Sequence, residues 1–266
     1  MRINEQKKFY RKNVYKFISF TLAEILMVMG IIGVVSALTI PNFKNNYGSS
    51  EKVARFKKVY AEIEQAQNLA VAVYGPIKYW FLEDGCVDRE DASTQCIAAS
   101  RRYLNRISKF LNTTKICDIE DADCMLPKKT KYLYGADASS RGTMVQLKNG
   151  SSIIFAAITR SKCDYGTKNE NCGTLELDID GQNRGKNTWG IDIFRFNITR
   201  RGLLPIGGNN YLADKIHYCT YNGIYCSVWV FEKGNMDYLL TSKQNQNLSK
   251  VCPNQKVLTW EDASCN

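Results

Sequence analysis

The hydrophobic and polar positions of the chain change their spacing from one stretch to the next. Residues 20–41 are almost entirely apolar and contain a single charge, Glu24. An α-helix rises about 1.5 Å per residue, so the roughly 21 residues from Phe20 to Ile40 would extend roughly 31 Å. That length matches the hydrocarbon core of a bilayer, which is about 30 Å thick. The pattern predicts one hydrophobic helix over residues 20–41, either spanning a membrane or buried in a filament core.

Apolar residues then recur at steps of three and four between residues 42 and 75, which indicates one face of a further helical stretch. Helices with this pattern pack one face on a globular body. Pro41 lacks an amide hydrogen and is expected to kink or loosen the helix, and Gly75 with Pro76 is a stop signal. We therefore predict an amphipathic helix half over residues 42–75. Its stripe consists of Val53, Phe56, Tyr60, Ile63, Gln67, Ala70 and Tyr74.

The sequence pattern of the remaining residues predicts a globular head over residues 76–266. Residues 76–140 are expected to form a connecting region with one short helix over Thr94–Phe110, and residues 207–266 a C-terminal cap with a strand-like piece over Tyr225–Phe231. Alternating residues between 141 and 206 indicate strands. These lie at residues 144–148, 152–158, 174–179, 191–198 and 203–206, with Asn149-Gly150 as a two-residue type I′ turn between the first two.

The distribution of charge along the chain indicates which side of a membrane the N-terminus would occupy. The net charge is +10, but residues 1–19 contain six Lys or Arg residues against one Glu, which leaves +5 for the rest. Basic flanks of a hydrophobic helix are typical of the cytoplasmic side. No run of Lys and Arg with interleaved aromatic residues follows Pro41. This argues against a nucleic-acid partner and for an ordinary solvated surface.

All ten cysteines lie at or after Cys86, and an even number of cysteines confined to one part of a chain indicates disulfides formed outside the cytoplasm. The absence of a Cys-x-x-Cys motif and the single histidine, His217, argue against a zinc site. Crossed pairings stay open. Neighbours in the sequence suggest the pairs Cys86–Cys96, Cys117–Cys124, Cys163–Cys172, Cys219–Cys226 and Cys252–Cys265.

The start of the apolar stretch carries a recognisable motif. Phe20, Thr21, Leu22 and Glu24, with Ala23 at the free position, resemble the N-terminus of type IV pilins and type II secretion pseudopilins. In that family a prepilin peptidase removes a basic leader before the phenylalanine, whose amine is then methylated. This chain has Ser19 where the family usually has glycine. An ordinary signal anchor would explain the length of the stretch, but not Glu24 or the Phe-Thr-Leu start.

The resemblance implies a leader over residues 1–19, cleavage between Ser19 and Phe20, and assembly through Glu24, which would pair with the terminal amine of a neighbouring subunit. The implied partners are other pilin or pseudopilin subunits, prepilin peptidase, an inner-membrane assembly platform and membrane lipid before assembly. The implied location is the bacterial inner membrane, single-pass with the head outside the cytoplasm, and then the pilus or pseudopilus. The predicted fold class is α+β, a long N-terminal helix with a membrane or filament half, packed on about four antiparallel strands in a disulfide-rich, pilin-like head.

One loop offers candidate metal ligands. Calcium prefers several oxygen ligands, and the loop from residue 178 to residue 192 provides them from Asp178, Asp180, Asn183, Asn187 and Asp192. Some major pseudopilins carry a calcium loop in this half of the chain. The favoured interpretation is an Asp-, Asn- and Gly-rich connection between strands, where these residues suit the backbone conformation. No cofactor is required by the sequence, and calcium is the alternative.

The sequence thus predicts a structural filament subunit rather than an enzyme, since no nucleophile motif such as Gly-x-Ser-x-Gly is present. Two alternatives stay open: a minor pilin that binds DNA or a surface ligand, and a membrane-anchored protein that never polymerises. The pattern does not separate a pilus from a secretion pseudopilus, or a major from a minor subunit.

Overall fold

The computed structural model describes residues 21–81, 94–117, 130–138, 145–164, 170–181, 184–206, 215–241 and 250–265; side chains are not described for residues 37–48, 94–95 and 215–218. The contacts within the chain divide it into two units, Met1–Asn46 and Tyr47–Asn266. The first unit contains the beginning of helix α1, and the second contains the rest of α1 together with the head. Each unit is described by itself below.

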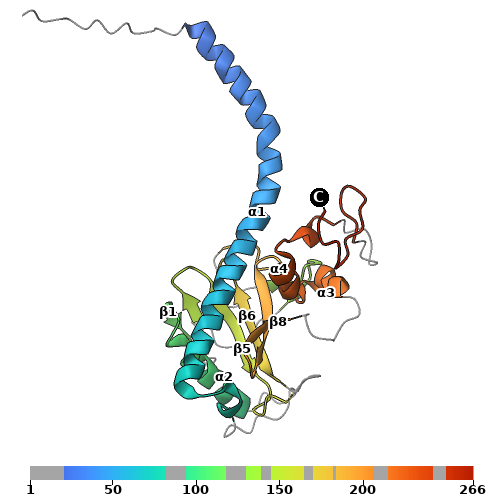
Figure 1. The fold of residues 1–266 in the computed structure, drawn as a ribbon. Helices are drawn as coiled ribbons and strands as arrows, with labels where there is room; N and C mark the ends of the chain where they lie inside the picture. The colour runs from blue at the N-terminus through green and yellow to red at the C-terminus, as the bar shows by residue number, and fades with distance from the viewer. Residues whose placement is uncertain are drawn as a thin grey trace, which may run out of the picture. The chain divides into compact units, whose positions relative to one another are not determined.

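Helix α1 runs over Leu22–Tyr74 (Figure 1). It ends where the sequence predicted, because Gly75 has a φ of 78° in the left-handed region that favours glycine, and Pro76 follows. We call residues 47–74, which belong to the second unit, the packed half of α1. Its buried positions follow the predicted stripe and include Val53, Phe56, Ile63 and Ala70.

The core of the head is a six-stranded antiparallel sheet in the order β1-β4-β5-β6-β7-β8. Two short strands, β2 (Thr130–Lys131) and β3 (Asp137–Ala138), form a separate pair. The six strands are β1 (Thr113–Ile116), β4 (Val145–Leu147), β5 (Ser152–Ile158), β6 (Asn171–Asp178), β7 (Ile193–Thr199) and β8 (Leu203–Pro205).

Aromatic side chains join the packed half of α1 to the sheet. Phe194 and Phe196 are two residues apart on β7 and therefore point to the same face. Phe56 contacts both of them, with ring centroids 4.8 Å and 5.6 Å away. Tyr60 stacks on Phe196 at 5.5 Å, and its hydroxyl donates to the backbone oxygen of Leu203 at 2.8 Å. Ring packing and one buried hydrogen bond thus fix the helix on this face.

Helix α2 (Thr94–Ser108) packs against β5. Its Ser100 hydroxyl accepts the Ile158 amide at 2.9 Å and donates to the backbone oxygen of Cys96 at 2.7 Å. Tyr103 is buried and donates to Gln67 Oε1 at 2.6 Å, which ties α2 to the packed half of α1. The short 3-10 helix η1 (Ile77–Tyr79) follows directly after the end of α1.

The last part of the chain contains helices α3 (Lys215–Asn222) and α4 (Cys226–Lys233) and the 3-10 helix η3 (Asp237–Leu239). A disulfide between Cys219 and Cys226 joins α3 to α4. The hydroxyl of Ser227 on α4 accepts the Arg195 amide of β7 at 3.1 Å. These contacts hold the C-terminal residues against the sheet, in the same unit.

The architecture corrects the predicted fold class. That prediction included a membrane half of the N-terminal helix, but none of the helices among the described residues combines the length and apolarity needed to cross a membrane. It also expected about four strands, whereas the sheet has six. Strand β1 was missed because it is short and three of its four residues are exposed, so no buried face appears in its sequence.

Two local predictions are also wrong. Residues 225–231 were expected to be strand-like, but residues 226–233 form α4, which ends at Gly234 with a φ of 66°. The turn before β5 is not type I′, which needs positive φ at both central residues. Gly150 alone of this pair has one, 93°. Its amide donates to the Leu147 oxygen at 3.1 Å, and Asn149 Oδ1 instead accepts the Ser151 amide at 2.9 Å.

Candidate functional site

The first candidate site is the beginning of α1, residues 22–35, which we call the apolar segment. Its large hydrophobic side chains are all exposed, from 45% at Ile25 to 76% at Leu22. They occur at nearly every position, so they surround the helix axis instead of forming one stripe. A helix that is apolar all round is normally buried. This segment is therefore an exposed surface that is apolar on all sides of the helix.

Glu24 lies in the first turn of the apolar segment and is hydrogen-bonded to Thr21. The Glu24 Oε2 atom accepts the Thr21 amide at 2.9 Å and the Thr21 hydroxyl at 2.8 Å, and the Glu24 amide donates to the Thr21 hydroxyl at 3.3 Å. This reciprocal pattern is a capping box, which satisfies amide groups at the start of a helix. Glu24 thus has a local role that the sequence prediction did not include.

The other predicted processing and assembly positions fall largely outside what the structure describes. Ser19 and Phe20 lie outside the described residues, as does the expected leader over residues 1–19. Pro41 lies within α1, where the backbone is helical but the side chain is not described. The cleavage site and the kink therefore stay predictions.

The second candidate site is the carboxylate cluster, which we define as Asp178, Asp180 and Asp192 at the ends of β6 and β7. Asp192 is fully buried, and backbone amides surround its carboxylate: Lys186 and Asn187 donate to Oδ2 at 2.6 Å and 3.0 Å, and Thr188 to Oδ1 at 2.5 Å. These three amides explain why the loop needs an aspartate at this position.

The remaining two members of the cluster are held differently. Asp178 is 1% exposed and accepts the Gly181 amide at 2.9 Å. Asp180 pairs with Lys52 of α1 at 3.1 Å through Oδ2, whereas its buried Oδ1 has no hydrogen-bond partner among the described residues. A Cβ added at Gly185 would lie 2.5 Å from an oxygen of Asp192 and 2.6 Å from one of Asp180, so the loop backbone closes directly over the carboxylates.

Burial and mutual repulsion change the proton affinity of this cluster. Burial raises the pKa of Asp178 to about 8, with further contributions from a hydrogen bond to Asp180 and from the negative charges of Asp180 and Asp192. Burial also raises the pKa of Asp192, although the amide of Thr188 and the charge of Lys52 act in the opposite direction. A neutral Asp178 that donates to Asp180 relieves the repulsion.

The cluster bears directly on the predicted calcium site. Three of the five predicted ligands come together, Asn187 contributes its backbone amide, and Asn183 lies outside the described residues. Among the described residues, no group of three or more His, Cys, Asp or Glu side chains is arranged to hold a metal ion. Backbone amides or Lys52 contact at least one oxygen of each of the three carboxylates, and the calcium site stays a prediction.

Disulfides connect three of the pairs suggested by the sequence: Cys163–Cys172, Cys219–Cys226 and Cys252–Cys265. Cys96 and Cys117 are also disulfide-bonded. Cys86 and Cys124, their predicted partners, lie outside the described residues, so those two pairings stay predictions. The prediction that the head is disulfide-bonded is thus confirmed for these three pairs.

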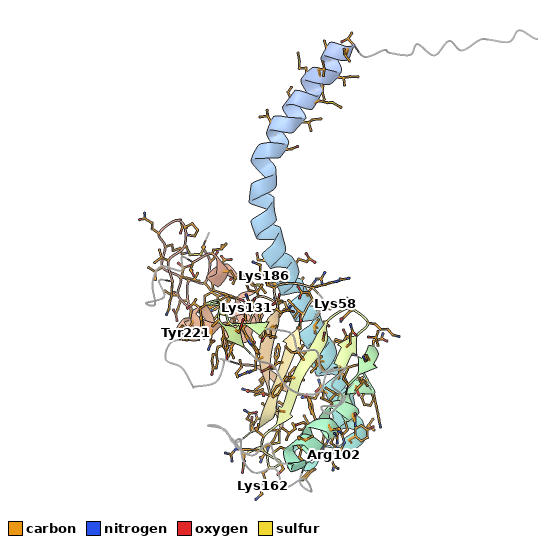
Figure 2. The ribbon with its side chains drawn as sticks, turned by 180° about the vertical axis from the view of Figure 1, so that it is seen from behind. Lys58, Arg102, Lys131, Lys162, Lys186 and Tyr221 are labelled. Atoms are coloured by element: carbon orange, nitrogen blue, oxygen red, sulfur yellow. A yellow bond between two sulfur atoms is a disulfide. The ribbon has the colours of Figure 1, made fainter. Side chains whose placement is uncertain are left out.

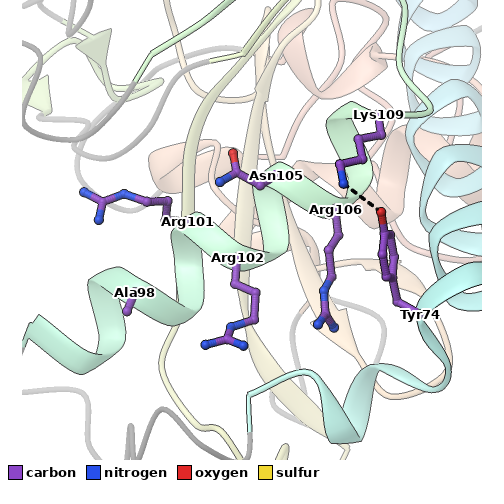
Figure 3. A pocket seen from close by; sticks show the side chains of 7 residues that line it. All are labelled: Tyr74, Ala98, Arg101, Arg102, Asn105, Arg106 and Lys109. Atoms are coloured by element: carbon purple, nitrogen blue, oxygen red, sulfur yellow. Dashed lines mark hydrogen bonds between the residues drawn. The ribbon is translucent and has the colours of Figure 1, made fainter.

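Sequence reasoning missed one group of charged residues on α2 and directly after it. Figure 2 shows where Arg102 lies in the head, and Arg101, Arg102, Arg106 and Lys109 line a single pocket (Figure 3). The signal was present in the spacing, since these positions recur at steps of one, three and four on a predicted helix. It went unnoticed because the residues do not form a continuous basic run.

Residues 43–203 match the model of a family described as "Family of unknown function (DUF6613)". The chain belongs to this family. The DUF6613 match spans the packed half of α1, α2 and the sheet as far as the first residue of β8, and the apolar segment lies before it. No curated protein and no solved structure matches the chain.

Proposed function

We propose that this chain is a structural subunit of a filament of the type IV pilus or type II secretion pseudopilus kind. Its apolar segments would pack together with those of neighbouring copies in the filament core, while the head faces outward. The observation that carries this proposal is the exposure of apolar side chains all round the first turns of α1, with one carboxylate at their start.

The energetics favour burial of this segment between copies. Moving one Val, Leu, Ile or Met side chain from water into an apolar environment contributes about 1.5–3 kcal/mol. A second copy of the same helix offers such an environment and is present wherever the protein is made. The disulfides of the head support assembly outside the cytoplasm.

Glu24 would set the register of the assembled helices. Its Oε2 atom serves the capping box with Thr21, and its charge would attract the terminal amine that cleavage before Phe20 creates on a neighbour. A carboxylate that is buried without a partner is costly, whereas a paired one is tolerated. Only an arrangement that pairs the two charges would therefore be stable.

The test must separate the charge of Glu24 from its role in the capping box. Glu24→Gln keeps an oxygen that can accept the Thr21 amide but removes the charge, whereas Glu24→Ala removes both. The full chain would be expressed in its native host, and the amount in sheared filaments measured by quantitative immunoblotting. Glu51→Gln, on the exposed surface of the packed half, is the control for loss of one negative charge.

If charge pairing drives assembly, both Glu24 variants fall to roughly a tenth of wild-type incorporation or less, as expected from a loss above about 1.4 kcal/mol. Glu51→Gln should assemble normally. Normal assembly of Glu24→Gln would contradict the pairing role, and absence of the wild-type chain from sheared filaments would favour the anchored, non-polymerising alternative. N-terminal sequencing of the native protein tests processing separately, because a chain that retains residues 1–19 would contradict cleavage before Phe20.

A further inference from the structure

The turn between β4 and β5 contains an asparagine directly followed by a glycine, Asn149 and Gly150. Asn149 is exposed, and a Cβ added at Gly150 would meet no described atom within 4 Å. Because glycine has no side chain, its backbone nitrogen is the least shielded of any residue. That nitrogen can attack the side-chain carbon of the preceding asparagine and close a five-membered ring, a reaction that proximity within one chain favours.

Neighbouring groups contact both ends of the Asn149 side-chain amide. The Ser151 amide donates to Asn149 Oδ1 at 2.9 Å, and the Ser151 hydroxyl donates to the same oxygen at 2.6 Å. Asn149 Nδ2 donates to Oε2 of Glu62, on the packed half of α1, at 2.7 Å. Two donors on a carbonyl oxygen stabilise the negative charge that develops there when a nucleophile adds to the carbon. The turn therefore activates the amide carbon and orients the nitrogen that would leave.

We propose that Asn149 is a modification site, where the chain deamidates itself with the assistance of Ser151. The Gly150 nitrogen gives its proton to water and bonds to Asn149 Cγ; the bond from Cγ to Nδ2 breaks, and Nδ2 takes up a proton and leaves as ammonia. Water then opens the cyclic imide at either carbonyl carbon, so the product is aspartate or isoaspartate. The whole reaction consumes one water and needs no other reactant. Before the ring closes, the Gly150 amide must leave the Leu147 oxygen, to which it donates at 3.1 Å.

A second pair of the same kind, Asn222 and Gly223, provides an internal reference. Asn222 is the last residue of α3, and the Gly223 amide donates to the Cys219 oxygen at 3.0 Å as part of the helix end. A Cβ added at Gly223 would lie 2.1 Å from the Trp189 oxygen, so the backbone there is closely packed. Attack by the Gly223 nitrogen would have to break the end of a helix inside the head. The fold therefore protects this pair and leaves the first one open.

Deamidation would change a contact between the turn and the packed half of α1. Asn149 Nδ2 is the donor in that contact, and Glu62 is the acceptor. A carboxylate at position 149 has no such donor, and its charge repels that of Glu62. The modification is irreversible, so it would mark older copies of the chain by a loosened turn. The inference concerns the head alone and does not depend on filament assembly.

The first test compares the two pairs in the purified full chain. The chain is incubated at physiological pH and temperature in water labelled with heavy oxygen, and peptide mapping by mass spectrometry follows uptake of the label. We expect conversion of Asn149 to be at least about tenfold faster than conversion of Asn222, because only the second needs opening of packed structure. In the denatured chain the two rates should be similar. Equal rates in the folded chain would overturn the proposal, as would an unlabelled Asn149 when the denatured chain has reacted completely.

The variant Ser151→Ala separates assistance by the turn from simple exposure. It removes the hydroxyl that donates to Asn149 Oδ1, so the rate of conversion should fall roughly three- to tenfold, as expected for one lost hydrogen bond. A turn that is merely loosened would react faster, because the Gly150 amide would be released more often. Ser152→Ala, at the next buried serine, is the matched control and should react as wild type. An unchanged or faster rate for Ser151→Ala would overturn the proposed assistance.

The consequence is tested with Asn149→Asp, which has the side chain of one product from the start. We expect its melting temperature to lie about 1–3 °C below that of wild type, because two like charges then face each other at the surface. Adding Glu62→Gln should recover most of this loss, since a glutamine amide can donate to the new carboxylate. A double variant that melts no higher than Asn149→Asp alone would overturn repulsion from Glu62 as the effect of the modification.

Discussion

The two ends of α1 belong to one helix but place their side chains in opposite environments. In the packed half, Phe56 is 1% exposed, and its neighbours on the same face are also buried. In the apolar segment, Leu22 is 76% exposed, and no face is polar beyond the first turn. The packed half has a partner in its own chain, the sheet. Under the proposed function, the apolar segment would take its partner from another molecule, and the difference between the two ends would then separate a stability role from an assembly role.

The largest effect should come from truncating the packed half. Phe56→Ala removes a ring that contacts both Phe194 and Phe196 and leaves a cavity, which costs about 3–5 kcal/mol. Leu26→Ala in the apolar segment should change the unfolding free energy of the head by less than about 0.5 kcal/mol. Chemical denaturation of the purified chain, followed by tryptophan fluorescence, measures both. Equal destabilisation by the two changes would remove the contrast between the halves.

This contrast also explains how much of the fold the sequence could predict. The stripe through Val53, Phe56 and Tyr60 was recognisable because a one-sided pattern has one structural solution, a helix on a body. The helix stop at Gly75 was recognisable because glycine and proline act through local backbone geometry. Strand β1 was not, since an exposed edge strand carries no periodic apolar signal.

Other errors arose where tertiary contacts decide between local options. The apolar run over residues 225–231 suits a short strand or a buried helix equally well. In the structure this run is a buried helix. The Cys219–Cys226 disulfide links it to α3, and it ends at Gly234. The same limit applies to the pocket on α2. The spacing places the cations on one face of the helix, but only the rotation of α2, set by buried Tyr103 and Ile107, turns that face away from the sheet.

The next largest effect concerns assembly. Val28→Asp places a second carboxylate in the middle of the apolar segment, where Val28 is 53% exposed in the single chain. If that surface is buried between copies, the unpaired charge costs several kcal/mol. We expect loss of filament incorporation with an unchanged melting temperature of the head. Lys58→Glu on the packed half is the control, because Lys58 is exposed on a helix whose partner is already in place. Normal incorporation of Val28→Asp would contradict a buried filament core.

A smaller effect tests how the head tolerates its carboxylate cluster. Folding raises the pKa of Asp178 from 3.8 to about 8, because the side chain is buried beside Asp180 and Asp192, with Lys52 as the facing cation. The stability that the folded state gains from holding the Asp178 proton is therefore fully present below about pH 4 and is lost as the pH rises towards 8.

Asp178→Asn mimics the neutral form, since its amide can donate to Asp180 while its oxygen accepts the Gly181 amide. We expect the variant to be more stable than wild type by on the order of 1–2 kcal/mol at pH 8 and to show a flatter pH dependence. Asp137→Asn, on exposed β3, should leave the pH profile unchanged. A wild-type head whose stability is constant between pH 4 and pH 8 would contradict a neutral Asp178.

The smallest expected effect is that of calcium on the head. Asp192 accepts three backbone amides, and Asp180 pairs with Lys52. A cation would have to displace these donors, so millimolar calcium should raise the melting temperature by less than about 1 °C. Calcium at 100 times its Kd would instead stabilise the head by about 2.7 kcal/mol, or roughly 5–10 °C for a domain of this size.

Lys52→Met sharpens this measurement because it removes the ammonium that pairs with Asp180 but keeps a side chain of similar length. If the lysine is the cation that the cluster uses, the variant gains a response to calcium that wild type lacks, while Lys57→Met at an exposed position behaves as wild type. A rise of several degrees in the melting temperature of wild type would confirm the calcium site predicted from the loop. Lys52 belongs to the packed half of α1. A wild type whose melting temperature does not respond to calcium would therefore mean that this helix both stabilises the head and provides a positive charge next to the carboxylate cluster.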